Sequence, residues 1–349
     1  MKTLALFADS KLSIPASTAW YLDTLGEFRG KQELYTRQSR QKLKILREHA
    51  IIESTVSSNR IEGVSVEPSR VQSVLVAAKP LFRDRDEEEI RGYRDALAWI
   101  HEDSSEIPLD ENTLKRMHAM ARGQIWDAGQ YKEKDGDIIE RYADGQERIR
   151  FKPTLARKTP AAMAKLVDTW NRCLQQKWAL PAVSLAAFNL DFLCIHPFRD
   201  GNGRVSRLIL QLQTYHTGME VGRYISLERL IEQNKDRYYE TLEQCSVGWH
   251  EGKHDPWPFI NYILYILKIA YQEFEERVGQ TAEPKGAKAE LVRDAVRKRQ
   301  GEFRLSDIEQ ACPSVGREWI RNVLADMREA GELQCEGRGV AARWKRIEG

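Results

Sequence analysis

The sequence predicts a mainly α-helical protein with one small β-hairpin and a separate C-terminal domain. Three observations predict this class. Apolar side chains recur at helical spacing in most segments, as in "VSLAAFNLDFLCI" and "AAMAKLVDTWNRCL". Two short alternating runs flank a glycine turn within residues 138–151, and a small polar stretch, "GQTAEPKGAKAE", follows Val278. The expected units are an N-terminal helical region (1–110), a helical core (111–278), a linker (279–288) and a C-terminal domain (289–349).

Composition limits the classes of protein to consider. With 42% hydrophobic residues the chain can form sizeable cores, and its net charge of +2 neither favours nor excludes a polyanionic partner. Its five cysteines form no C-x-x-C pair, which is typical of reduced thiols in a cytoplasmic protein. The opening "MKTLALFADS" is too short in its apolar part for a signal peptide, and "PFINYILYILKIAY" is too short for a span of roughly 20 apolar residues. We expect a cytoplasmic protein without a membrane partner.

The core elements follow from local patterns. "EEEIRGYRDALAWIHE" has the helical period and an acidic start, which suits a helix N-terminus. "DPWPFINYILYILKIAYQEFEERV" has the same period over a longer stretch. The runs "IIERY" and "ERIRF" lie on either side of Ala143, Asp144 and Gly145, so they predict a β-hairpin that ends before Pro153.

The C-terminal segment has a different pattern. "AELVRDAVRKRQ" is helical, "RLSDIEQAC" predicts a short helix capped by Ser306, and "SVGREWIRNVLADMREAG" predicts a longer helix that Gly331 ends. "ELQCEGRGVAARWKRI" alternates around Gly337 and Gly339 like a small hairpin. Three helices followed by a β-ribbon match a winged-helix domain.

One segment, "HPFRDGNGRVSR" at residues 196–207, concentrates polar chemistry. The preceding helix should end near His196, because the residue before a proline avoids the α region. Gly201 and Gly203 lack a Cβ, so the backbone of "GNGR" can approach a ligand closely. Loop amides followed by a helix N-terminus make an anion site. The segment therefore predicts a site for a phosphate-bearing ligand.

Four side chains give this predicted site its chemistry. Arg204 and Arg207 are three apart, so they share a helix face, and guanidinium groups suit phosphate oxygens. Asp200 beside bound phosphates is a natural ligand for Mg²⁺. The side-chain type of His196 can take a proton from an incoming hydroxyl. Each piece alone is usually structural, but the joint pattern indicates phosphoryl or nucleotidyl transfer.

The segment also matches every fixed position of H-x-F-x-[D/E]-G-N-G-R-x-x-R, and residues 50–275 therefore resemble the Fic (filamentation induced by cAMP) family. The resemblance implies a helical Fic core with the motif on a loop between two helices. It implies transfer of AMP from ATP, with Mg²⁺, to a Tyr, Thr or Ser hydroxyl of a target protein or of the chain itself. The implied roles are His196 as general base, Asp200 as magnesium ligand, Gly201, Asn202 and Gly203 in the anion hole, Arg204 on phosphate and Arg207 on the γ-phosphate.

Two flanking segments fit the same resemblance. The hairpin lies where the family has a flap that aligns the target backbone by strand addition, and Ile149 and Phe151 are candidates for clamping the modified side chain. A solvated hairpin is the alternative. "NKDRYYETLEQCSVG" resembles the family segment that closes over adenine, which implies contacts from Tyr238 and Tyr239. Some relatives have asparagine where this chain has Ser246.

The stretch "SSNRIEG" resembles the family's inhibitory helix, [S/T]-x-x-x-E-[G/N]. Ser58 and Glu62 are four apart on one helical face, and Gly63 ends the turn. Taken alone, a surface glutamate is the default interpretation. The resemblance implies an inhibitory helix at about residues 50–63, in which Glu62 pairs with Arg207 and keeps the γ-phosphate out. It therefore implies an autoinhibited enzyme.

The C-terminal domain leaves two partners open. From residue 285 onward there are fourteen Lys and Arg against eleven Asp and Glu, a small basic excess. Arg317 and Arg321 share a face of the candidate recognition helix, and the wing region carries Arg338, Arg343, Lys345 and Arg346. These residues suit phosphate contacts with DNA, or they are solvated charges on a domain that docks a protein.

The leading hypothesis is an autoinhibited protein adenylyltransferase. One alternative is a DNA-binding regulator that uses the Fic core as a nucleotide-sensing or dimerising platform. Others within the enzyme class are removal of AMP from a target and use of another phosphate-containing donor. The sequence has no G-x-x-x-x-G-K-[ST] segment, which argues against ordinary phosphotransferases. The resemblance also leaves a homodimer open.

Overall fold

The computed structural model describes residues 2–8, 13–36, 40–77, 82–141, 146–280, 287–299, 301–337, 339 and 342–347. Helices dominate these residues, so the predicted mainly α class is confirmed. The α-helices are α1 (Thr3–Leu6), α2 (Ala16–Thr36), α3 (Arg40–Ile61), α4 (Arg85–Asp103), α5 (Glu111–Arg122), α6 (Thr159–Gln176), α7 (Pro181–Ile195), α8 (Asn202–His216), α9 (Leu227–Gln233), α10 (Lys235–Ser246), α11 (Trp257–Gln280), α12 (Ala287–Arg297), α13 (Leu305–Ala311) and α14 (Arg317–Glu329). The strands are β1 (Ile138–Arg141), β2 (Glu147–Phe151), β3 (Glu302–Phe303), β4 (Leu333–Glu336) and β5 (Arg343–Arg346), and shorter turns of helix are η1 (Pro68–Arg70), η2 (Gln72–Val76), η3 (Ala156–Lys158) and η4 (Val221–Arg223). None of the described helices combines the length and the apolarity needed to cross a bilayer.

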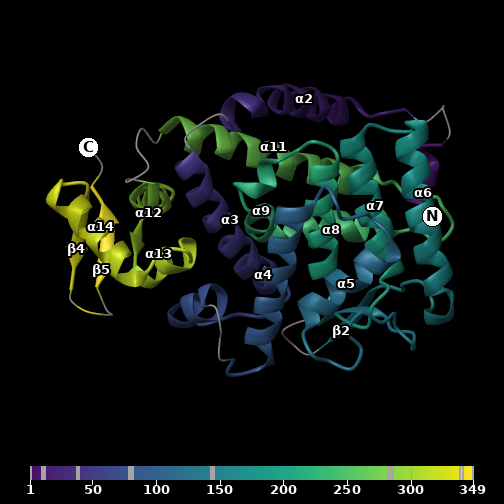
Figure 1. Ribbon diagram of the computed structural model, residues 1–349, viewed down its shortest axis with the longest axis horizontal. Helices are drawn as coiled ribbons and strands as arrows, with labels where there is room; N and C mark the ends of the chain where they lie inside the picture. The colour runs from purple at the N-terminus through teal and green to yellow at the C-terminus, as the bar shows by residue number, and fades with distance from the viewer. Residues whose placement is uncertain are drawn as a thin grey trace.

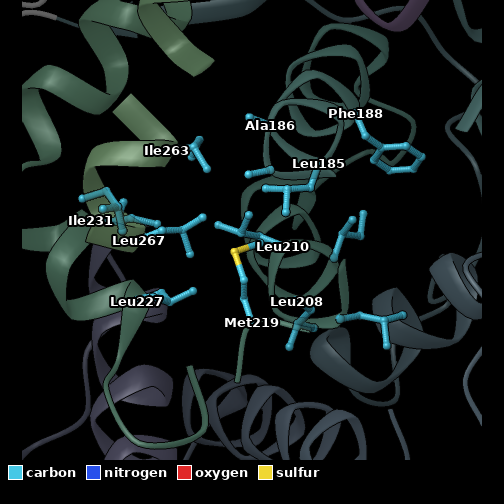
Figure 2. Close-up of a cluster of buried hydrophobic side chains, with 14 of the residues drawn as sticks. Leu185, Ala186, Phe188, Leu208, Leu210, Met219, Leu227, Ile231, Ile263 and Leu267 are labelled. Atoms are coloured by element: carbon cyan, nitrogen blue, oxygen red, sulfur yellow. The ribbon is translucent and has the colours of Figure 1, made fainter. Parts of the chain in front are cut away.

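Helix α7 forms the centre of the main core. Every residue from Ala182 to Ile195 is buried, and the helix packs against α6, α8 and α11. Figure 2 shows side chains of α7, α8, α9 and α11 meeting in this core, among them Leu185, Leu210 and Leu267. A helix that is apolar on all faces must be covered on all sides. Its neighbours therefore fix the position of its C-terminal end.

A buried carboxylate ties the N-terminal segment to α7. Asp191 accepts hydrogen bonds from the backbone N–H groups of Thr3 at 2.9 Å and Leu4 at 3.1 Å. It also accepts one from the indole Nε1 of Trp249 at 2.6 Å. Since buried carboxylates are tolerated where donors satisfy their oxygens, Asp191 joins three separate parts of the chain at the helix that precedes the motif.

Strands β1 and β2 form the antiparallel hairpin predicted for residues 138–151. Ile139 pairs with Ile149, and the register shifts between Ile138 and Ile139. The side chains of Arg148 and Arg150 pair with Glu243 of α10 at 2.8 Å, which attaches the hairpin to the core. The predicted turn at Ala143, Asp144 and Gly145 lies outside the described residues.

Residues 287–347, here called the C-terminal module, form a second packed unit, drawn in yellow-green to yellow in Figure 1. Its helices surround a hydrophobic cluster of their own that includes Val292, Ile308, Ile320 and Leu333. Its strands form an antiparallel sheet in the order β3-β5-β4. The predicted linker falls mostly on residues 281–286, and these, like Arg338 of the predicted wing, lie outside the described part of the chain.

The N-terminus of α13 differs from the prediction. The N-cap residue is Arg304, and Ser306 lies inside the helix. The backbone N–H of Arg304 donates to Asp307 Oδ2 at 2.7 Å, so the aspartate three residues later satisfies the helix start. The prediction of a Ser306 cap is therefore wrong.

Candidate active site

The ends of α7 and α8 hold the motif loop between them. His196 is the C-cap of α7 and has a left-handed backbone with φ 52°, so the helix ends where the proline predicts. Gly201 has φ 78° and precedes α8, which starts at Asn202. The first N–H groups of a helix have no acceptor within the helix. The loop therefore aims the N-terminus of α8 at the space beside His196.

Internal contacts fix the shape of the loop. The amide side chain of Asn202 accepts from the backbone N–H of Phe198 at 2.9 Å and donates to its carbonyl at 2.8 Å. The Phe198 ring is fully buried and stacks on His118, with ring centroids 3.9 Å apart. Since Gly129 donates its N–H to His118 Nδ1, His118 Nε2 carries the proton and donates to the Asp200 carbonyl at 3.0 Å. Asn202 and His118 thus hold the loop from both sides.

The ring of His196 is poised as a proton acceptor. Its Nδ1 lies 3.3 Å from the Leu193 carbonyl, to which an Nδ1–H donates, and this leaves Nε2 with a free lone pair. Burial, followed by the nearby positive charge of Lys132, lowers the pKa of His196 to about 4. The imidazole is therefore neutral at pH 7 and able to act as a base.

A cavity of about 340 Å³ opens beside this ring. Its lining brings together several predicted residues that are far apart in the sequence, namely Glu62, Phe151, His196, Gly203, Tyr238 and Tyr239. A second cavity, of about 450 Å³, also has His196 in its wall, together with Trp126 and Tyr131. His196 therefore lines both cavities.

Glu62 reaches into the first cavity from the turn after α3. Its Oε1 lies 2.8 Å from Arg207 Nη2, and Arg207 Nε donates to the Ser58 hydroxyl at 2.8 Å. A Cβ added to Gly203 would lie 2.1 Å from Glu62 Oε1, so the carboxylate rests directly on the first turn of α8. Arg207 itself is 2% exposed. The carboxylate thus occupies a position suited to an anionic ligand.

A buried carboxylate outside the motif, which its local sequence did not single out, links Arg204 of the motif to Arg122 of α5. Glu89 on α4 pairs with Arg204 Nη1 at 2.7 Å and with Arg122 Nη1 at 2.7 Å. Arg122 also lies 2.9 Å from Asp200 Oδ2. The signal for Glu89 was its place on the apolar stripe of α4, four residues before the buried Tyr93. An acid on a buried stripe requires partners.

The side chains of Arg204 and Asn202 are bound by other protein groups, whereas Gly203 faces the first cavity. Arg204 is 2% exposed, and its Nη1 also contacts Asn59 at 3.2 Å. Its guanidinium is held by protein groups, as is the side chain of Asn202. Gly203 lines the cavity.

Asp200 has the chemistry of a magnesium ligand. Its carboxylate side chain is 62% exposed. Partial burial acts to raise the pKa of Asp200, but the charge of Arg122 and the hydrogen bond from the Gly201 N–H hold this pKa below its usual value. The described residues contain no group of three or more His, Cys, Asp or Glu that could hold a metal ion. One carboxylate nevertheless suits Mg²⁺, because this ion is commonly held by one or two carboxylates and the phosphates of its substrate.

The predicted flap and adenine residues differ in exposure. Ile149 is 51% exposed, whereas Phe151 is half-buried and stacks on His250 with centroids 5.4 Å apart. Tyr238 is nearly buried and packs edge-on against Tyr239 at 5.2 Å. Phe151 and both tyrosines line the first cavity.

Comparisons with known proteins show the family of this chain. The Fic/DOC family model matches residues 108–214. A Fido domain-containing protein from Dictyostelium discoideum is 32% identical over 127 residues, which cover 34% of this chain and 79% of that protein. The chain belongs to the Fic/DOC family. Fic proteins are typically nucleotidyl or phosphate transferases, so membership supports a Fic-type enzyme.

Two further similarities differ in extent. A Fic family protein from Desulfovibrio desulfuricans G20 has a TM-score of 0.62 and 24% identity, and the match covers 98% of this chain and 99% of that one. This likeness shows that the two chains share a fold over nearly their whole length. A ribonucleoside-diphosphate reductase small chain from Ostreid herpesvirus 1 (isolate France) is 30% identical over 149 residues, 40% of this chain. This chain spans only 25% of the viral protein's length.

Proposed function

We propose that this Fic protein is an autoinhibited protein adenylyltransferase. The observation that carries the proposal is the meeting of His196, Gly203 and Glu62 at one cavity, where Glu62 also pairs with the buried Arg207. A neutral base, a helix N-terminus and a buried guanidinium are the groups that transfer of a nucleotide requires. The carboxylate among them accounts for inhibition.

The proposed reaction is a displacement at the α-phosphorus of ATP. A hydroxyl of the target enters from the second cavity and gives its proton to His196 Nε2. Its oxygen forms a bond to the α-phosphorus, and the bond to the bridging oxygen of pyrophosphate breaks. AMP is then esterified to the target, and pyrophosphate leaves. The two cavities on either side of His196 support this route, because donor and acceptor can approach the same ring.

Other side chains bind and orient ATP in this proposal. Asp200 would hold Mg²⁺, which neutralises phosphate charge when bound. The N-terminus of α8 binds phosphate oxygens through Gly203, and Tyr238 and Tyr239 form the apolar wall for adenine. Ile149 and Phe151 of the hairpin position the target. Arg207 binds the γ-phosphate once Glu62 has left it, and we call the Glu62–Arg207 pair the brake.

Labelled-ATP transfer by four variants tests the function and the brake together. Glu62→Gly should raise AMP transfer strongly over the wild-type chain, because Arg207 is freed. His196→Ala should abolish transfer with or without Glu62→Gly. Intact mass and peptide mapping of the Glu62→Gly protein with ATP and Mg²⁺ identify the group and the residue type. An inactive Glu62→Gly protein, or an active His196→Ala protein, contradicts the proposal.

A further inference from the structure

The C-terminal module contacts the helix that carries the brake. Figure 1 shows α12 of the module beside α3, and the two helices pack against each other. At this contact the Ser314 hydroxyl of the module forms a hydrogen bond with His49 Nδ1 of α3. His49 is 2% exposed. One face of α3 is therefore covered by the module rather than by the Fic core.

A chain of polar contacts, buried in its middle part, continues from this contact into the Fic core. His49 Nε2 lies 3.5 Å from Glu53 Oε1, and Glu53 Oε2 lies 3.1 Å from Arg229 Nε of α9. Arg229 pairs with Glu273 of α11 at 2.7 Å, and Glu273 lies 3.5 Å from Lys298 of the module. The chain thus starts and ends on the module and passes through α3 and the core. Buried charges of this kind depend on their partners.

The interface is largely polar and incompletely filled, although Leu291 of α12 packs into the main hydrophobic core. A cavity of about 410 Å³ lies within it, with Glu53 and Arg60 of α3 on one wall and Asp294 and Lys298 of the module on another. Polar interfaces between units that have separate cores permit relative motion. The module has its own hydrophobic cluster. A core of its own is what the module needs to stay folded when it is away from α3.

The same helix continues from this interface to the active site. Glu53 is five residues before Ser58, and Ser58 and Asn59 contact Arg207 and Arg204 of the motif. Since a helix rises about 1.5 Å per residue, the module contact and the brake are within roughly 20 Å on one rigid element. A change in how α3 is held at His49 and Glu53 is therefore transmitted toward Glu62.

We propose that the C-terminal module is a clamp on the brake. When docked, it holds α3 so that Glu62 stays on Arg207; when a partner of the module draws it away, α3 loosens and the brake opens. The inference rests on the proposed function, because it concerns regulation of the same site. In this proposal, the Glu62–Arg207 pair is formed more often when the module is docked than when it is undocked. Such a difference between two states is what coupling between two sites requires.

Ser314→Arg in the full chain tests the clamp, because a long cation at this contact wedges the module away from His49. Basal AMP transfer should rise about fivefold or more, a coupling of ordinary size. Lys298→Glu, which places like charges beside Glu273, should act in the same direction. Asn322→Arg is the matched control, since it adds the same side chain at an exposed position of α14 and should leave transfer unchanged.

The Glu62→Gly background separates a clamp from an unrelated effect. There Ser314→Arg should change transfer by less than about twofold, because no brake remains to be released. Amide hydrogen exchange of residues 49–61 gives a readout without catalysis, and it should speed up in Ser314→Arg but not in Asn322→Arg. If Glu62→Gly is active, and Ser314→Arg speeds up the exchange of residues 49–61 but leaves basal AMP transfer unchanged, the clamp is overturned. An inactive Glu62→Gly protein overturns the proposed function, whereas exchange still reports on the contact.

Discussion

At the scale of single residues, the surroundings of His196 decide its protonation. Burial and the charge of Lys132 lower its pKa to about 4 from an ordinary 6.5. An unfolded chain therefore binds more protons at this residue between these two pH values. It follows that His196 reduces stability as the pH falls from 6.5 towards 4, and contributes no such loss above that range. The ring is available as a base throughout the neutral range.

Replacement of Lys132 by methionine should raise the pKa of His196, because a positive charge near the imidazole is removed. NMR titration of the His196 ring in both proteins measures the change directly. Lys134→Met is the control, since it removes a lysine from an exposed position of the same segment. An unchanged or lower pKa in Lys132→Met contradicts the assigned cause.

Glu89 is the second residue whose effect can be measured. In Glu89→Gln, Arg122 and Arg204 would remain buried without their shared carboxylate, so the free energy of unfolding should fall by about 3 kcal/mol. Urea denaturation measures this loss. Asp86→Asn, at an exposed position in the first turn of the same helix, should cost much less. Equal losses in the two variants would show that the pairing adds no specific stability.

Residues inside the motif could be predicted because their pattern is local. The positions of His196, Gly201 and Gly203 follow from a proline, two glycines and a helix start within twelve residues. His118, Arg122 and Glu89 belong to helices more than 70 residues earlier, and no local spacing joins them to the loop. Only the buried position of Glu89 on its helix indicated that it needed a partner.

At the scale of elements, the core helices could be predicted because apolar residues at helical spacing indicate which face of a helix is buried. The exact first and last residues of the helices were harder to predict. The Ser306 cap failed because serine and aspartate both occur near the start of α13, and the structure uses Asp307. The apolar run of α7 predicted a buried helix, but Asp191 within it gave no indication of the distant donors that it binds.

Replacement of Asp191 by alanine should lower the free energy of unfolding by about 3 kcal/mol. The change leaves the N–H groups of Thr3 and Leu4 and the indole of Trp249 without a buried acceptor. Guanidinium denaturation provides the measurement. Asp168→Ala is the matched control, because Asp168 on α6 has a side chain 65% exposed. A loss below about 1 kcal/mol for Asp191→Ala is the result that would contradict this role.

At the scale of the whole molecule, the chain has one large core and a smaller cluster in the C-terminal module. The composition change after Val278 predicted a separate unit there. Docking of that unit on α3 was not predictable, because His49, Glu53 and Lys298 resemble solvated charges in their local sequence. Only the tertiary structure brings these three residues close enough to belong to one chain of contacts.

Ile320→Ala should loosen the module selectively. Ile320 is fully buried in the module's cluster, so the cavity left behind should cost about 3 kcal/mol. Hydrogen exchange should accelerate in α14 and remain unchanged in α7, since the two helices belong to different clusters. Equal acceleration in both helices would mean that the chain unfolds as one cooperative unit.

The winged-helix assignment and its binding to DNA remain predictions at this scale. Arg321 on α14 is exposed, whereas Arg317 pairs with Glu309 at 3.0 Å. If α14 binds duplex DNA, affinity should fall steeply with salt, and Arg321→Ala should reduce the salt slope by about one phosphate contact. Fluorescence anisotropy measures this slope. Salt-insensitive binding, or none, favours a protein partner for the module.

Glu89 pairs with two buried arginines, Arg122 and Arg204, besides the more exposed Arg85, and this has a consequence for the evolution of the chain. A mutation that removes the Glu89 carboxylate leaves Arg204 inside the motif and Arg122 outside it without their shared partner. A second mutation within the motif loop therefore cannot restore the lost stability by itself. Among homologous sequences, substitutions at position 89 should therefore covary with substitutions at positions 122 and 204. A substitution at position 89 alone should be rare in functional homologues.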